Sequence, residues 1–209
     1  MKFLFFIFFL CFSLAAGASA TTFTDNFSQD SRAEYSLYDS WTTGGVGSFN
    51  YDSAGERIEL LTEDNVGLAF SHSLPATESG SFSVDFLPTV HYPIGGVFTL
   101  KLIQDDQTYY EISNTDGYGP YGISKYINGE EVDSKLFQSG YSQNTNYSIS
   151  VDFTPSETTV QAFGETIVIS SDTTAITVNS FSIDTFQQDA YYDNIVYNTA
   201  SSSSSSSTT

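Results

Sequence analysis

The stretch SFSVDF at residues 81–86 alternates strictly between polar and apolar side chains. The same alternation returns in YSISVDF at residues 147–153 and, with one slip, in VNSFSIDTF at residues 178–186. Successive side chains of a β-strand point to opposite faces of its sheet. Each stretch therefore predicts a strand with one face on a core and the other toward water. No part of the chain shows a sustained helical period of 3.6 residues.

Turn signals separate these stretches from further strand patterns. Asn128-Gly129 is the strongest short hairpin signal, and Asp105-Asp106, residues 154–157 and Gly164-Glu165 predict further turns. Short strands in this antiparallel order predict an all-β sandwich or jelly roll. The predicted strands are residues 24–27, 34–41, 48–52, 57–62, 66–72, 80–87, 96–103, 108–113, 122–127, 131–136, 147–154, 158–163, 166–170, 177–186 and 190–198.

The first 20 residues have the pattern of a secretory signal. Lys2 precedes an apolar run at residues 3–14, and small residues follow up to Ala20. This order is typical of a cleaved export signal, and the run is too short to span a bilayer. Cleavage after Ala20 would remove Cys11 and leave a mature β-sandwich domain, residues 21–198, without disulfides. We expect a secreted protein, either extracellular or periplasmic, that has no membrane anchor once the signal is removed.

Residues 199–209 differ in composition from the domain before them. Residues 201–207 are all serine, and two threonines follow. Such a segment has no apolar surface to bury, which predicts a flexible linker or tail. A linker joins two parts, so further domains beyond this segment are one expectation and a natural tail is the other.

The charge balance is strongly acidic. Without the signal, 5 basic residues remain against 25 acidic ones, a net charge of −20. This charge repels nucleic acid and anionic membrane surfaces, and it also disfavours a strongly anionic polysaccharide. Solubility in a salty medium is the simplest explanation for the acids, and binding of a divalent cation is the functional alternative.

Several motifs, in order, resemble the concanavalin A-like, or laminin G-like, jelly rolls found as carbohydrate-binding modules in secreted bacterial proteins. The likeness covers residues 23–198. It includes Asp25-Asn26-Phe27 before a strand that ends at Trp41, the central residues 81–113, and the closing residues 191–195. The resemblance implies a concanavalin A-like antiparallel β-sandwich with a lectin-like function and a polysaccharide or other glycan as partner.

The resemblance also implies a calcium site, since related sandwiches often hold calcium where the first and last strands meet. The matching residues are Asp25 and Asp193, with help from Asn26, Asn194 or a backbone carbonyl. Calcium takes six to eight oxygen ligands, many of them carboxylates and carbonyls. A structural calcium ion is therefore expected there. The alternative is that both acids are exposed or form turns.

A glycan surface is expected on the strand at residues 108–113 and its neighbours. Alternation places Tyr110 and Ile112 on one face of this strand and Tyr109 and Glu111 on the other, solvent-facing one. Lys101, on the neighbouring strand, is predicted to face the solvent as well. Sugars pack their C–H faces on aromatic rings, in the way that other apolar groups do. The alternative is that these tyrosines are ordinary core or sheet-surface residues.

An aromatic, glycine-rich loop at residues 116–121 follows this strand and extends the predicted surface. The predicted carbohydrate-binding residues are Tyr109, Glu111, Tyr118, Tyr121, Lys125, Tyr126 and Trp41.

Catalysis is not favoured, because no complete catalytic motif is present. Hydrolases of this fold carry three acids on alternate positions of one strand, and residues 130–133 lack the third acid. Residues 57–60 echo a lyase motif but lack its final arginine, and His72 and His91 have no zinc-ligand spacing. A non-catalytic carbohydrate-binding domain is the main prediction. A divergent lyase or hydrolase and a structural or adhesive domain are the alternatives.

Overall fold

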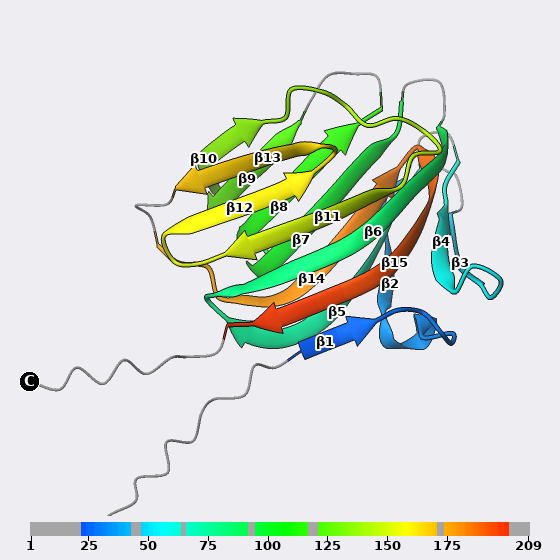
Figure 1. The fold of residues 1–209 in the computed structure, drawn as a ribbon, viewed down its shortest axis with the longest axis horizontal. Helices are drawn as coiled ribbons and strands as arrows, with labels where there is room; N and C mark the ends of the chain where they lie inside the picture. Colours follow the sequence, from blue (N-terminus) through cyan, green and yellow to red (C-terminus); the bar gives the residue numbers. More distant parts are fainter. Residues whose placement is uncertain are drawn as a thin grey trace, which may run out of the picture.

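The computed structural model describes residues 22–42, 47–63, 66–91, 95–116, 121–170 and 174–200. These residues form two antiparallel sheets stacked face to face, and Figure 1 shows β13, β12, β11, β6 and β15 in one layer in front of the other. The bounds of the strands in the first sheet, sheet A, are β1 (Thr22–Asp25), β3 (Ser48–Asp52), β4 (Arg57–Leu61), β6 (Gly80–His91), β11 (Tyr147–Phe153), β12 (Glu157–Ala162), β13 (Glu165–Ser170) and β15 (Gln188–Thr199). Their order is β13-β12-β11-β6-β15-β4-β3, and β1 also pairs with β15.

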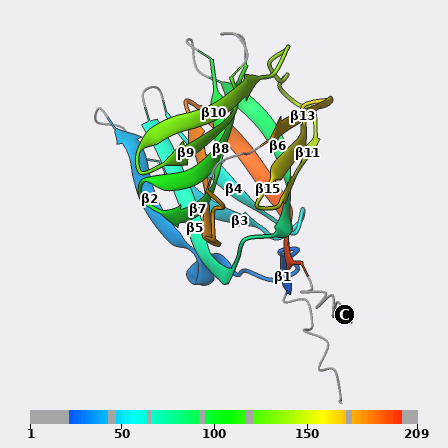
Figure 2. The same cartoon turned by 90° about the vertical axis from the view of Figure 1, so that its left-hand side faces the viewer.

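The second sheet, sheet B, has the order β10-β9-β8-β7-β14-β5-β2. Figure 2 shows β10, β9, β8 and β7 side by side, with β5 and β2 beyond them. The bounds of its strands are β2 (Ser36–Thr42), β5 (Val66–Thr77), β7 (Val97–Asp105), β8 (Thr108–Thr115), β9 (Gly122–Ile127), β10 (Glu130–Leu136) and β14 (Val178–Phe186). A short 3-10 helix, η1 (Arg32–Glu34), precedes β2. Within the described part of the chain, no helix is long and apolar enough to cross a membrane.

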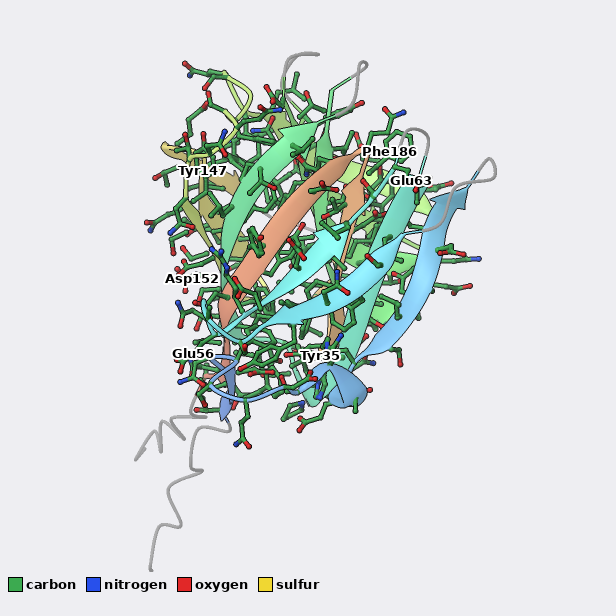
Figure 3. All side chains as sticks on the ribbon, turned by 90° about the vertical axis from the view of Figure 1, so that its right-hand side faces the viewer. Tyr35, Glu56, Glu63, Tyr147, Asp152 and Phe186 are labelled. Atoms are coloured by element: carbon green, nitrogen blue, oxygen red, sulfur yellow. The ribbon has the colours of Figure 1, made fainter. Side chains whose placement is uncertain are left out.

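The core lies between the sheets and is filled by the apolar members of each alternating stretch. Phe82 and Phe86 of β6 have no exposed surface, and neither do Val151 of β11 and Phe181 of β14. Seen along the edge formed by β3 and β4, side chains from both sheets occupy the space between them (Figure 3). The alternation therefore predicted correctly which face of each strand is buried.

All fifteen predicted strands are present, most within one or two residues of their predicted ends. The hairpin at Asn128-Gly129 is confirmed, and both residues have the positive φ, +53° and +81°, that a tight two-residue turn requires. One turn was predicted one residue too late. The turn between β12 and β13 is formed by Phe163 and Gly164, and Glu165 already pairs with Ala162.

Phe163 tolerates its positive φ, +54°, because its ring is anchored in the core. The ring lies 5.4 Å from that of Phe137 and 5.5 Å from that of Tyr141, centroid to centroid. A turn prediction based on Gly164 does not include Phe163 as a turn residue, because the left-handed conformation is unusual for a bulky residue.

On the outer face of sheet B, the strand β5 carries only small side chains next to its pairing with β14 and β2. Leu68 and Phe70 point into the core, so the outward positions of this strand are Gly67, Ala69 and Ser71. Gly67 and Ala69 are nevertheless buried, and Ser40 of β2 reaches Asp184 of β14 across this strand. The candidate site lies on this outer face, among residues of β2, β7, β8 and β14.

Candidate functional site

A groove crosses the outer face of sheet B as three adjoining hollows. The middle hollow has a volume of about 380 Å³ and is lined by residues of β2, β7, β8 and β14. It shares Ser40 and Asp184 with one neighbouring hollow, and Tyr38 and Ser182 with the other. We call this continuous depression the sheet B groove.

A pair of stacked tyrosines lies beside the sheet B groove. Tyr109 of β8 lies directly opposite Tyr126 of β9, and their ring centroids are 4.7 Å apart with an angle of 26° between the planes. The Tyr126 hydroxyl donates to Glu131 at 3.3 Å. Tyr109 also lines the middle hollow, so the structure brings two of the predicted tyrosines together at the edge of the groove.

Lys101 and Glu111 flank the Tyr109 ring. The Lys101 ammonium lies 4.7 Å from the ring centroid and 3.1 Å from a Glu111 carboxylate oxygen. Burial alone would lower the pKa of Lys101, but the Glu111 carboxylate raises it above its ordinary value. Lys101 therefore remains charged. Tyr110 lies on the opposite face and is buried, as the alternation predicts.

Lys125 does not belong to this surface, so its prediction as a sugar contact is wrong. Its side chain has no exposed surface, and its ammonium points into the sandwich, 5.7 Å from the Tyr110 ring centroid. Burial lowers its pKa. The reason is parity: Lys125 and Tyr126 are neighbours on one strand, so only one of them can face the solvent.

Of the remaining predicted sugar contacts, only Tyr121 has a side chain that the structure describes. Tyr121 is half exposed and lies just before β9. Trp41 lies on β2 opposite Gly67, at the level of the groove, but its side chain is outside the described part. Tyr118 lies outside the described residues.

Asp184 is a site residue that the sequence reasoning missed. Its half-buried carboxylate accepts a hydrogen bond of 2.8 Å from Ser40 of the edge strand β2. Burial raises the pKa of Asp184 to about 6, against the lowering effects of Ser40 and Lys101. The alternation of residues 178–186 already placed Asp184 on the outward face. Its position in a groove depended on the pairing of β14 with β5 and β7.

Asp25, predicted as a calcium ligand, closes a loop in this structure. Its carboxylate accepts hydrogen bonds from the Phe27 amide at 2.8 Å, the Ser31 hydroxyl and the Tyr35 hydroxyl at 2.8 Å. These three donors tie the end of β1 to the loop that follows it, so the Asp25 carboxylate closes this loop without a metal ion. Calcium binding at Asp25 stays a prediction.

Asp193, the second predicted ligand, faces Asp85 across the β15–β6 pairing. Burial and then the Asp85 charge raise the pKa of Asp193, while the Asn194 amide donates to it at 2.7 Å. Among the residues that the structure describes, no three His, Cys, Asp or Glu side chains gather where they could hold a metal ion. The calcium ion therefore stays a prediction.

The two-sheet arrangement is shared with a Bacillus licheniformis β-glucanase. The two structures superpose with a TM-score of 0.60 over 84% of this chain and 97% of the glucanase, at 12% sequence identity. The fold is a concanavalin A-like jelly roll. The CBM2 module of the evolved Dit protein of Lactobacillus casei BL23 phage J-1 has the same jelly roll, with a TM-score of 0.66, 11% identity, and coverage of 86% of this chain and 95% of the module.

A carbohydrate-binding module from Bacillus subtilis, CBM66, also shares the jelly roll. Its TM-score is 0.53 at 12% identity, over 76% of this chain and 95% of the module. Identities this low show the fold alone. No protein-family model matches the sequence, and neither does any of the curated proteins compared with it.

The outward positions of the central strands of this jelly roll carry few acids. β7 presents Thr99, Lys101 and Ile103, and β8 presents Tyr109 and Glu111 with a serine beyond them. Neither strand supplies the three alternating acids of a hydrolase. What these strands offer is an aromatic stack, a charged pair and a groove beside them.

Proposed function

We propose that this protein is a secreted, non-catalytic domain that binds a polysaccharide along the sheet B groove. The observation that carries the proposal is the Tyr109–Tyr126 stack at the side of a hollow of about 380 Å³. Ligand sites of this kind combine apolar or aromatic surface with a few polar groups that fix orientation. Ser40, Ser182 and Asp184 supply those polar groups here.

The shape of the groove favours an extended ligand over a single small molecule. Three hollows follow one another across the strands, from Phe186 and Val97 through the middle hollow to Ser73 and Glu34. A polymer of sugar rings can fill such a row of hollows while one ring packs against the Tyr109–Tyr126 pair. The jelly-roll neighbours include both carbohydrate-binding modules and glucanases, which supports a carbohydrate partner in general.

The test is a binding assay on a panel of polysaccharides with the variant Tyr109→Ala. Loss of the ring face should weaken binding roughly two- to ten-fold, since an aromatic contact contributes about 0.5–1.5 kcal/mol beyond its buried area. Tyr191→Ala is the matched control, because Tyr191 is an outward tyrosine on sheet A, next to Arg57. Equal binding by the parent chain and Tyr109→Ala would refute the groove as the site.

A hydrolase is the second candidate, and the environment of Asp184 favours it. A carboxyl group with a pKa raised to about 6 can donate a proton, and a second carboxyl group, that of Glu111, lies 3.1 Å from the Lys101 ammonium in the same region. Glycoside hydrolases generally use two carboxyl groups that lie in contrasting environments. Release of reducing sugar by the parent chain and not by Asp184→Asn would favour this candidate. Binding without release supports the first.

Silence toward every glycan in the panel, together with retained adhesion to surfaces, would favour a structural or adhesive domain instead. Export is tested by the N-terminal residue of the mature protein, which should be Thr21 if the signal is removed after Ala20.

A further inference from the structure

We propose that the sheet B groove selects polysaccharides that carry positive charge, namely polymers of amino sugars with free amines. This deepens the proposed function and rests on it, because it names the class of polysaccharide that the same groove would bind. The inference comes from the balance of charges along the groove.

Acids dominate the lining of the groove. Asp39, Asp105, Asp106 and Asp184 line the middle hollow, and Glu34 lines the hollow next to it. The amide of Gln107 donates to Asp105 and lowers the pKa of that carboxyl, which keeps it charged. A concave site lined by charges of one sign concentrates ligands of the opposite sign.

Among the described residues that line the three hollows, Lys101 is the only lysine or arginine, and its charge is already balanced. Its ammonium is paired with Glu111 at 3.1 Å. The carboxylates of Asp39, Asp105, Asp106 and Asp184 therefore outnumber the bases of the groove, and the groove keeps a net negative charge near neutral pH.

The groove also shows how an ammonium group is held there. The Lys101 ammonium sits against the face of the Tyr109 ring, 4.7 Å from its centroid, with the Glu111 carboxylate on another side. An aromatic face and a carboxylate are the two groups that best hold a desolvated ammonium. The ammonium of an amino sugar is the same chemical group, and Asp105 and Asp106 are available to a ring that packs nearby.

The acidity of the whole chain complicates a simple binding assay. A net charge near −20 attracts any polycation, whether or not the groove is involved. The experiment must therefore separate charges in the groove from charges elsewhere. At about 0.1 M salt the Debye length is roughly 10 Å, so exposed charges on the far sheet are largely screened from a ligand in the groove.

The experiment is a calorimetric titration with two oligosaccharide ligands of the same backbone and length. One is the free-amine glucosamine oligomer and the other is its fully N-acetylated form, both at mildly acidic pH and about 0.1 M salt. The free-amine oligomer should bind at least five-fold more tightly, which corresponds to one charge pair at about 4 Å in water. Raising the salt should weaken the free-amine complex and leave the N-acetylated one unchanged.

Variants show whether the preference for the free-amine oligomer arises from acids in the sheet B groove. Asp105→Asn together with Asp106→Asn should weaken binding of the free-amine oligomer about 25-fold, or roughly five-fold for each charge. Asparagine at position 105 retains the side-chain oxygen that accepts from Gln107, so the turn is preserved. The control pair, Asp152→Asn with Glu157→Gln, makes the same change in net charge on sheet A and should have little effect. Figure 3 shows Asp152 on the β11 side of the sandwich, away from β2.

Lys101→Gln provides a second test, which acts in the opposite direction. It removes a competing ammonium and leaves Glu111 for the ligand, so it should strengthen binding of the free-amine oligomer about five-fold. Weaker binding of that oligomer by Lys101→Gln would contradict the inference. Thermal melts of each variant show whether it is folded.

The remaining outcomes are distinguishable. Equal weakening by the groove pair and the control pair would mean that bulk charge alone acts, which overturns the inference. Equal binding of both oligomers, lost in Tyr109→Ala, would also overturn it while the proposed function stands. Failure of every polysaccharide to bind at the groove would overturn both.

Discussion

Replacing Asp25 by alanine should destabilise the domain strongly, with or without calcium. The Asp25 carboxylate accepts from one amide and two hydroxyls, and it ties the end of β1 to Ser31 and to Tyr35. Tyr35 is buried beneath this contact, with its ring edge-on to Phe70 at 5.4 Å, near the base of the sandwich in Figure 3. Burial and the Asp25 hydrogen bond raise the pKa of Tyr35, so the phenol stays a donor.

The size of the effect follows from these three hydrogen bonds. Hydrogen bonds to a charged group contribute about 1.5–3 kcal/mol each. Asp25 is half-buried, so water replaces part of what is lost, and about 3 kcal/mol is a reasonable sum. For a domain of this size, that corresponds to a fall in Tm of roughly 6–12 °C.

The assay is thermal unfolding followed by circular dichroism, with calcium and with a chelator. Asp152→Ala is the control, because Asp152 is an exposed acid on β11, and it should change stability by no more than about 0.5 kcal/mol. If Asp25 closes the loop, Asp25→Ala lowers the Tm equally in both solutions. If Asp25 binds calcium instead, the parent melts higher in calcium and the variant loses only that gain. A Tm for Asp25→Ala as high as that of the control would refute the loop cap.

Two further predictions concern stability. Asp184→Asn should stabilise the domain by about 1–2 kcal/mol at pH 7 and by almost nothing at pH 4. The cost of burying this carboxyl builds up as the pH rises from the ordinary pKa of 3.8 to the folded-state pKa of about 6, and it is complete above that pH. Urea unfolding at both pH values checks this, and an equal effect at both would contradict it. Gly164→Ala should cost about 1 kcal/mol because of its φ of +81°, since an added methyl group there meets no other atom within 4 Å and backbone strain is the only penalty; no loss of stability in the same assay would count against the turn.

The strands could be predicted from the sequence because a strand's alternation is a local property. Phe82, Val84 and Phe86 are buried and Ser83 and Asp85 between them are not, and a period of two is enough to say so. The same rule, applied consistently, would have excluded Lys125 from the surface that contains Tyr126. That error came from grouping neighbours by chemistry and not by face.

The groove could not be predicted in the same way, because it depends on pairing between distant strands. Asp184 of β14 meets Ser40 of β2 across 144 positions of the chain, and Lys101 reaches Glu111 because β7 pairs with β8 in one particular register. A shift of that register by one residue would turn these side chains to the other face.

By itself, the sequence determined that this chain is an all-β domain with an acidic surface, because strand period and net charge are properties of residue order and composition. Only the tertiary structure decided that Asp25 closes a loop, that Lys125 is buried, and that Ser40 and Asp184 meet in a groove beside Tyr109. Each of these depends on which strands lie next to one another, and that is set by packing of the whole core.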